Sequence, residues 1–494
     1  MPLIIPANSA AASGGFAVDN SLRFNRASSD YLNRTPSSEG NKRTMTFSFW
    51  LKRTQITAES YFIYSAGADA SNRDAIMFAN QSLRVISQRN ESTYWLRNTT
   101  RLFRDSSAWS HIVIAIDTTQ GTDSNRIKIY INGVQETAFE TYAWGSAYPS
   151  QNFDTYFNDD ISQAIGSYSQ SSGNHHDGYI SEFVMIDGTA LDPTSFGEFD
   201  EDSGIWKPIS VSGLTFGTNG FYLETKQSGT SQNSSGLGAD TSGNDNHFAV
   251  NNLTAIDQST DTCTNNSATW NSLVHFSTSA TFSEGNLKVA PTENTSRVYT
   301  VSTIAMPTVS GSKWYAEFKY LETNDHALIG ILDAKQISFV FHNNSDLDNQ
   351  NGDTSVGRVT YRSGNGLIKF PSGQSVDSSV TLSNNDIVMI ALDSGSGKIW
   401  FGVNGTWTNS GDPAADSNGV DFSGQSWWTS GVEDFVFFAG SGNTGGHDDW
   451  EANFGSPPFA ISSGNSDGNG YGNFEYAVPS GYYALNTKNL AEYG

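Results

Sequence analysis

Residues 386–405 read DIVMIALD-SGSG-KIWFGVNG. An apolar strand ends at an Asp, a small polar loop turns the chain, and a second strand ends at Asn-Gly, which is the pattern of a β-hairpin. The chain repeats it with SHIVIAID at residues 110–117 and RIKIYINGV at residues 126–134. In both copies we expect the Asp to close one turn and the Asn-Gly pair to start the next. Two copies in different halves predict two β-sandwiches on one chain.

The size and composition agree with this prediction. A chain of 494 residues is too long for a single hydrophobic core, so we expect two or three domains. Aromatic residues make up 13% of the chain, glycines number 47, and Ser, Thr, Asn and Asp crowd the stretches between the apolar runs. This mixture is typical of short strands joined by turns. The sequence therefore predicts an all-β protein of two antiparallel, jelly-roll-type sandwiches in tandem.

The charge and the cysteine count exclude several classes of protein. The net charge of -24 repels phosphate backbones, so nucleic acid is not an expected partner. Cys263 is the single cysteine, which excludes a disulfide-stapled module. No apolar run is long enough for membrane insertion. The start of the chain lacks a basic region and Pro6 breaks its apolar run, so we expect no secretory signal.

The chain divides into five expected segments. Residues 1–20 are rich in small residues and without periodicity, and we expect either a disordered segment or an attachment arm that orders on another subunit. The first sandwich is expected over residues 21–204 and the second over 268–485. Between them, residues 205–267 are rich in Gly, Ser and Asn and favour a linker with a short hairpin over strands lent to a neighbouring sandwich. Residues 486–494 form a tail.

Four motifs carry a resemblance in the first half. They are Phe47-Ser48-Phe49-Trp50-Leu51, Trp109-Ser110-His111-Ile112-Val113, Lys128-Ile129-Tyr130-Ile131-Asn132-Gly133-Val134 and Gly178-Tyr179-Ile180-Ser181-Glu182-Phe183. In this order they resemble the laminin-G-like/concanavalin A-like lectin superfamily. The resemblance implies a β-sandwich, in which Phe47, Phe49 and Leu51 alternate onto one face. It leaves the ligand open, because such domains bind sugars or proteins.

The second half resembles the SPRY (B30.2) domain. The motifs are Lys313-Trp314-Tyr315-Ala316-Glu317-Phe318, Ala327-Leu328-Ile329-Gly330-Ile331-Leu332-Asp333, the 386–405 hairpin, Asp434-Phe435-Val436-Phe437-Phe438 and Asn453-Phe454-Gly455. That family implies a protein-binding sandwich with no catalytic residues.

The stretches outside these motifs resemble bacteriophage proteins. Residues 2–6, 217–254 and 471–490 are similar to segments of marine bacteriophage tail-fibre and virion-surface proteins. The resemblance implies location on a virion, contact with other virion proteins and homo-oligomers, with trimers favoured. Attachment to the particle is then expected through the arm, at Leu3, Ile4 and Ile5.

Catalytic and metal sites are weakly indicated. The nearest approach to the Glu-x-Asp-x-x-Glu pattern of glucanases is Glu198-Phe199-Asp200-Glu201-Asp202, which lies off any alternating strand, so we interpret it as a solvated acidic turn and expect no enzyme. His175-His176 suits a surface pair better than a metal site. Two oxygen-rich loops, 158–160 and 346–353, could bind Ca²⁺, but turn formation explains them as well, so no cofactor is expected.

Aromatic side chains beside polar ones are the best candidates for sugar binding, because rings stack on pyranose faces. In the second sandwich they are Trp427 and Trp428, which we expect on a strand with one ring facing outward, and Asp449 with Trp450. In the first sandwich they are Trp144 with Tyr148, and the Tyr94-Trp95 pair.

The leading prediction is a virion structural protein, a tail fibre or surface adhesin, that displays its sandwiches to a host-cell surface glycan or protein. Weak sites repeated over a particle would then gain avidity. A capsid or tail decoration protein without a host ligand is the alternative, and a polysaccharide-degrading enzyme is the third.

Overall fold

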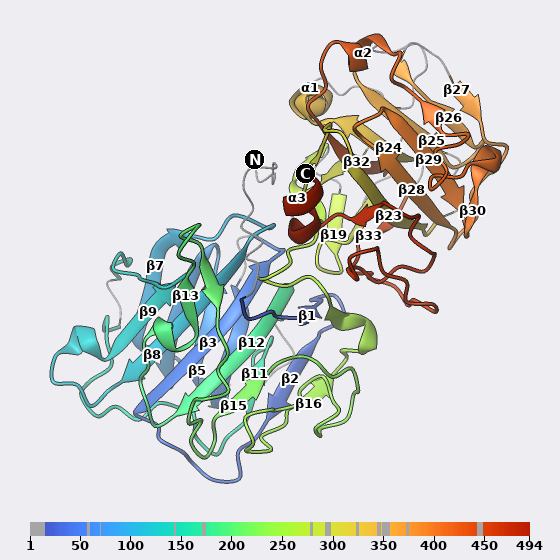
Figure 1. Cartoon of the computed structure of the whole chain (residues 1–494). Coiled ribbons are helices and arrows are strands. Elements are labelled where there is room, and N and C mark those ends of the chain that lie inside the picture. Colours follow the sequence, from blue (N-terminus) through green and yellow to red (C-terminus); the bar gives the residue numbers. More distant parts are fainter. Residues whose placement is uncertain are drawn as a thin grey trace. The chain divides into compact units, whose positions relative to one another are not determined.

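The computed structural model describes residues 15–56, 60–69, 71–142, 145–169, 174–276, 280–291, 298–322, 326–342, 347, 356–371, 375–441 and 448–494. The chain forms two compact units, which we call the N-terminal unit (Ala12–Thr264) and the C-terminal unit (from Asn265 to Gly494). Each unit contains two large sheets that are antiparallel apart from one short parallel pair, and the N-terminal unit has a further two-stranded sheet, so the predicted all-β class is confirmed (Figure 1). No helix within these residues is long and apolar enough to cross a membrane.

The first sheet of the N-terminal unit is built around β3, with β8 and β12 at its sides (Figure 1). Its order is β10 (Val134–Gln135), β9 (Ile127–Ile131), β8 (Trp109–Asp117), β3 (Thr44–Arg53), β12 (Gly178–Asp187), β1 (Ser21–Phe24) and β17 (Gln258–Ser259), and β15 (Phe221–Leu223) also pairs with β12.

The second sheet faces the first across the core. Its order is β16 (Ala249–Asn251), β2 (Tyr31–Arg34), β11 (Gln163–Ile165), β4 (Ser60–Asp69), β5 (Asn72–Ala79), β6 (Ser82–Arg89) and β7 (Ser92–Leu102), and β13 (Gly197–Phe199) pairs separately with β14 (Trp206–Pro208). Phe47, Phe49 and Leu51 are buried in the core, as their alternation predicts.

The C-terminal unit has the same two-sheet plan. One sheet contains β18 (Trp270–Phe276), β21 (Val298–Ser302), β32 (Asp434–Ser441), β24 (Ala327–Asp333), β25 (Arg358–Arg362), β26 (Leu367–Lys369) and β27 (Ser375–Asp377), with β22 (Met306–Pro307) on β32. The other contains β19 (Ala280–Ser283), β20 (Lys288–Pro291), β33 (Trp450–Asn453), β23 (Lys313–Tyr320), β28 (Ile387–Asp393), β29 (Lys398–Val403) and β30 (Thr406–Trp407), with β31 (Val420–Asp421) on β29 and β34 (Tyr483–Ala484) parallel to β23. The helices are α1 (Ile337–His342), α2 (Ser426–Thr429) and α3 (Thr487–Tyr493).

The hairpin pattern that occurs in both units ends at the same kind of Asn-Gly turn in each. Asn132 and Asn404 each have φ 49°, and the glycines after them have φ 78° and 83°, as a type I′ turn requires. The backbone N–H of His111 donates to Oδ1 of Asn132 at 2.7 Å, and that of Ile387 donates to Oδ1 of Asn404 at 2.9 Å. Both copies are therefore scaffold.

The prediction of a linker over residues 205–267 is wrong. The strands β15, β16 and β17 extend both sheets of the N-terminal unit, and Phe221, Leu237 and Phe248 are buried in its core. These strands are only two or three residues long, so their apolar content is small. β15 nevertheless pairs with β12, about 40 residues earlier, and β16 and β17 pair with β2 and β1, more than 200 residues earlier. Residues 205–264 therefore complete the first sandwich, the alternative that the sequence disfavoured.

The expected boundaries at the two ends of the chain also change. Val18 is buried, and its backbone N–H donates to Oγ1 of Thr264 at 3.0 Å, so the described end of the arm lies on the N-terminal unit. The expected tail is instead α3, whose Leu490 reaches the core of the C-terminal unit. Leu3, Ile4 and Ile5 lie outside the described residues.

Candidate functional site

A pocket of about 350 Å³ opens in the N-terminal unit. It is lined from both sheets, by the ends of β3, β7 and β9 and the start of β8, and we call it the arginine pocket. Its lining residues are Leu51, Arg53, Arg101, Leu102, Phe103, Arg104, Asp105, Ala108, Ser110, Ile131 and Asn132. The volume lies at the lower end of the range for small-molecule sites, about 300–1,000 Å³.

The alternation of β3 places Arg53 in this pocket. Successive strand residues point to opposite faces, so Arg53 continues the face of Phe47, Phe49 and Leu51. The first three of these positions carry core side chains and the fourth carries a guanidinium, which is 3% exposed. Leu51 and Ile131, both buried, add an apolar surface beside it.

The charge of Arg53 is held without a carboxylate. Its guanidinium donates to the carbonyl oxygens of Phe103 and Asn80, at 3.1 and 3.0 Å, and lies 4.1 Å from the centre of the Phe78 ring. Burial lowers the pKa of Arg53 to about 10. Within the described residues no carboxylate forms an ion pair with it. Two carbonyls and a ring replace water only in part, so the positive charge remains available to an anion.

Two further arginines stand at the rim. Arg101 pairs with Glu136 at 2.7 Å, and Arg104 donates to Oε1 of Gln81 at 2.6 Å. Asp105 is the carboxylate of the lining, and it accepts from the N–H and the hydroxyl of Ser107, at 2.8 and 2.6 Å. Three arginines against one aspartate make the pocket cationic on a chain whose net charge is -24.

Sequence reasoning missed this pocket, although one signal was present. A charged residue that continues the inward alternation of a core strand, as Arg53 does, is unusual, because buried charges are rare without a partner. The contributions of Arg101 and Arg104 could not be read locally, since they depend on β7 meeting β8 and β9 around the end of the sandwich.

The tryptophan pair of the second half is not on a strand. Trp427 and Trp428 lie in α2, and both rings pack against core aromatics, Trp427 on Phe422 and Trp428 on Phe435. Trp427 is buried and Trp428 is half-buried. The expectation of one inward and one outward ring is therefore wrong, because a helical turn directs both toward the same core.

The other candidates of the second half are also held in the fold. Trp450 is completely buried in β33 and packs on Tyr320 with ring centres 5.1 Å apart. It presents no face to a sugar, which corrects the expectation of stacking there. Asp449 is half-buried, and its carboxylate lies 3.4 Å from Nζ of Lys288.

The candidates of the first half have different surroundings. Tyr148 is half-buried, and its ring lies 4.4 Å from the guanidinium of Arg97, which also lies 3.5 Å from the ring of Phe139. Tyr94 is 56% exposed, whereas Trp95 is fully buried. Trp144 lies outside the described residues. Tyr148 is therefore bound to an arginine between two rings and does not line the arginine pocket.

The histidine pair is buried, which corrects the expectation of a surface pair. His175 and His176 are 4% and 1% exposed, and burial lowers the pKa of His176 to about 3, with the charge of Arg53 adding to the effect. Within the residues that the structure describes, no group of three or more His, Cys, Asp or Glu side chains is arranged to hold a metal ion. Of the second candidate Ca²⁺ loop, 346–353, only Leu347 is described.

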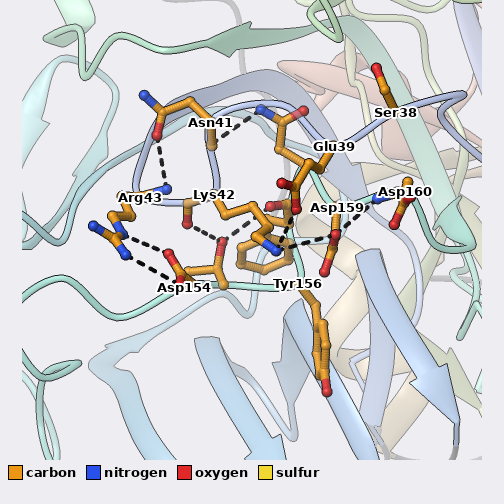
Figure 2. A network of polar contacts seen from close by, with 12 residues as sticks. Ser38, Glu39, Asn41, Lys42, Arg43, Asp154, Tyr156, Asp159 and Asp160 are labelled. Atoms are coloured by element: carbon orange, nitrogen blue, oxygen red, sulfur yellow. Dashed lines mark hydrogen bonds and ion pairs between the residues drawn. The ribbon is translucent and has the colours of Figure 1, made fainter.

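Figure 2 shows the first candidate Ca²⁺ loop, where carboxylates meet the chain's own cations. Nζ of Lys42 lies 2.8 Å from Glu39 and 3.5 Å from Asp159, and Arg43 pairs with Asp154 at 2.6 Å. A hydrogen bond with Glu39 raises the pKa of Lys42, and one with Arg43 lowers the pKa of Asp154. These pairs join loop 38–43 to loop 154–160.

The acidic stretch that begins in β13 and continues beyond its end lacks the properties of a glycosidase pair. Glu198 is exposed, and Lys207 lies 3.4 Å from it and 3.1 Å from Asp200. Hydrogen bonds from Ser203 and Lys207 lower the pKa of Asp200 to about 2. A general acid requires a raised pKa, so this carboxyl cannot protonate a leaving group near neutral pH.

Glu182 is a buried acid that the sequence did not single out. It lies at a bulge of β12 with φ 52°, and its carboxyl accepts a hydrogen bond from the hydroxyl of Tyr222. Burial raises the pKa of Glu182 to about 7. The hydrogen bond of Tyr222 and the charge of Lys226 act against this rise, while Glu224 and Asp19 add to it. Glu182 does not line the arginine pocket, and we interpret it as a structural group.

Glu182 makes the stability of the N-terminal unit depend on pH. Since its pKa is raised in the folded state, its contribution is fully present below about pH 4.5 and is lost as the pH rises through about 7. Glu182→Gln, which imitates the protonated form, is expected to stabilise the unit by about 3 kcal/mol at pH 8 and to change little at pH 4. Urea unfolding between pH 4 and 8 measures this, with Glu198→Gln, at an exposed side chain of the same unit, as the control. Parallel pH profiles for Glu182→Gln and the unaltered chain would contradict it.

Comparison with solved structures found fold likenesses at low identity. The SPRY domain of human HERC1 is similar at 10% identity, covering 37% of this chain and 96% of that one, with a TM-score of 0.27. A putative carbohydrate binding protein from Bacteroides ovatus is 14% identical over 48% of this chain and 58% of that one, with a TM-score of 0.31. Domains LG4-5 of the mouse laminin alpha1 chain are 8% identical over 95% of this chain and 99% of that one, with a TM-score of 0.28. At these scores the likenesses say nothing about function.

A comparison with protein families is more specific, although a search of curated proteins found no match. All the residues that line the arginine pocket fall within the matched segment. Residues 26–194, within the N-terminal unit, match the family described as the concanavalin A-like lectin/glucanases superfamily.

Proposed function

We propose that this chain is a non-catalytic recognition protein of a bacteriophage virion, a tail fibre or surface adhesin, which binds a host-cell surface saccharide through the arginine pocket. The observation that carries the proposal is the pocket itself, in which a buried, carboxylate-free guanidinium lies beside an apolar surface and exposed polar groups. The lectin/glucanase family match over residues 26–194 supports saccharide as the ligand class. The virion setting rests on the resemblance of residues 2–6, 217–254 and 471–490 to phage proteins.

Recognition fits the pocket better than hydrolysis does. A glycosidase needs two carboxyl groups about 5–10 Å apart, one of them with a raised pKa. The lining contains Asp105 alone, and that carboxylate accepts two hydrogen bonds from Ser107. Donors dominate the pocket, and donors hold a ligand without cleaving it.

The proposal also includes the oligomeric state of the chain and its attachment to the virion. Attachment through Leu3, Ile4 and Ile5 and a trimeric state remain predictions, and so does the contact with other virion proteins. Avidity from repeated copies would compensate for weak binding at the small arginine pocket.

Two measurements test the proposed function. The full chain, immobilised on a glycan array, is expected to bind a subset of saccharides, and antibodies against it are expected to label intact virions and to slow their adsorption to host cells. Virions that lack the protein and still adsorb at the normal rate would exclude an adhesin and favour a decoration protein. Release of reducing sugar from a bound glycan would favour the enzyme.

A further inference from the structure

We infer that the arginine pocket is specific for a saccharide that carries an anionic group, a carboxylate or a sulfate, and that Arg53 is the residue that binds this group. The inference rests on the proposed function, because it names the chemical class of the ligand for the same pocket.

Burial of the charged Arg53 guanidinium is energetically costly. Removing a guanidinium from water costs several kcal/mol unless a counter-charge or full hydrogen bonding replaces the water. Arg53 is 3% exposed and contacts two backbone carbonyls and the Phe78 ring. An anion entering the pocket would supply the missing counter-charge, so the ligand gains from a cost that the fold has already incurred.

The N–H donors of Arg53 have a geometry that suits an anion. A guanidinium carries more N–H donors than the carbonyls of Phe103 and Asn80 use, and its planar fork matches a carboxylate or a sulfate. Because the same contacts fix Arg53, little side-chain entropy is lost when an anion binds. The pocket therefore contains a preorganised anion site.

The groups around Arg53 add further hydrogen-bond donors and an apolar surface to the pocket. Arg104 adds an exposed guanidinium, and Oδ1 of Asn132 accepts from the N–H of His111, an arrangement that leaves the amide nitrogen of Asn132 to donate. Leu51 and Ile131 offer an apolar contact of the kind that one face of a sugar ring makes. This combination suits an anionic sugar.

The size of the pocket and the negative charge of the chain exclude a polyanion such as nucleic acid as the ligand. The pocket is small, and the chain around it has a net charge of -24, so a long run of phosphates would be repelled outside the three arginines. A ligand with one or a few charges enters the same field at much lower cost.

Binding of glucuronate, glucose 6-sulfate and glucose to the full chain, followed by saturation-transfer NMR, tests the inference. One or both anionic sugars are expected to bind at least about tenfold more tightly than glucose, and the affinity is expected to fall as NaCl rises from 0.05 to 0.5 M. Preference for glucuronate would identify a carboxylate, and preference for the sulfate ester would identify a sulfate.

The variants separate Arg53 from a general charge effect. Arg53→Lys keeps the charge and loses the fork, and it is expected to weaken binding about tenfold or more. Arg104→Gln, at the exposed rim, is expected to weaken it about threefold and tests the pocket if Arg53→Lys fails to fold. Arg43→Gln is the matched control, because Arg43 precedes β3 and lies roughly 30 Å from Arg53 at the other end of that strand. Its variant is expected to bind as the unaltered chain does.

Several results would overturn the inference. Equal affinities for glucose and both anionic sugars would show that the pocket has no specificity for an anionic group, while the proposed recognition of saccharides would stand. Binding of a tetraglutamate peptide in place of all three sugars would assign the pocket to a protein partner. Binding on the glycan array that Arg53→Lys and Arg104→Gln leave unchanged would place the saccharide site elsewhere. No binding to any sugar or array would reject both proposals.

Discussion

Asp261→Ala is expected to destabilise the N-terminal unit by about 3–5 kcal/mol. Oδ2 of Asp261 lies 2.7 Å from Nζ of Lys52, its Oδ1 accepts from the indole N–H of Trp109 at 3.0 Å, and both charged side chains are at most 1% exposed. Removing the carboxylate leaves a lysine buried without its counter-charge. Urea unfolding of the full chain, monitored for this unit by hydrogen exchange, measures the loss.

Two further variants define what the Asp261 result means. Asp245→Asn, in the same segment but with an 89% exposed side chain, keeps a residue type that tolerates the backbone φ of 56° and is expected to change the stability by less than about 0.5 kcal/mol. The double variant Lys52→Met/Asp261→Leu is expected to recover most of the loss, because a buried ion pair can be replaced by apolar groups at small net cost. A double variant as unstable as Asp261→Ala would show that the charge pair is not the cause.

The second large effect is expected at Glu317 in β23. Its carboxyl accepts four hydrogen bonds, from the hydroxyl of Tyr315 at 2.9 Å, from the side-chain amide of Asn453 at 3.1 Å, and from the backbone N–H groups of Glu475 and Tyr476 at 2.9 and 2.8 Å. Glu317→Ala leaves four donors without this partner and is expected to cost about 4 kcal/mol or more. Hydrogen exchange should then rise first in residues 456–484, whose backbone this carboxyl holds.

Glu317→Gln sharpens the same prediction. Oε1 accepts from Tyr315 and Tyr476, and Oε2 accepts from Asn453 and Glu475, so an amide NH₂ in either position faces two donors. We expect Gln to be nearly as destabilising as Ala, whereas Glu433→Gln, whose side chain is 73% exposed, should have a small effect. A Glu317→Gln variant as stable as the unaltered chain would show that the carboxylate oxygens are not required as acceptors.

The hairpins were predictable from the sequence because their signals are local. Alternating apolar residues and an Asn-Gly pair specify two strands and a turn with φ > 0 without reference to the rest of the chain. The same holds for Phe47, Phe49 and Leu51, whose period of two places them on the core face. The class and the tandem arrangement followed from these elements.

Residues 205–264 could not be assigned in this way, because their structure depends on partners far away in sequence. Phe221, Phe248 and Asp261 stand in polar, turn-rich surroundings and resemble a linker. Phe221 pairs with β12, made some 40 residues earlier, whereas Phe248 and Asp261 contact Arg34 and Lys52, made some 200 residues earlier. Periodicity cannot reveal such a contact.

The candidate site residues were also predictable only where the signal was local. The sequence indicates Trp427 and Trp450 as aromatic residues beside polar ones, and the structure uses both rings to pack its core. The exposure of a tryptophan is decided by the elements around it, which local composition does not describe. Arg53 was the reverse case, a residue whose inward position could be read from β3 but whose pocket required β7, β8 and β9.

The pairing of β1 with β17 has a consequence for how the chain is made. Ser21 lies opposite Ser259 and Leu22 opposite Gln258, so β1 leaves the ribosome some 240 residues before one of its neighbours in the sheet is synthesised. At about 5–20 residues per second, that interval is roughly 10–50 seconds. Closure of the N-terminal unit is therefore a late event during translation, and pairing over such a separation in sequence is slow. A nascent chain arrested before residue 257 should remain open to proteases along β1.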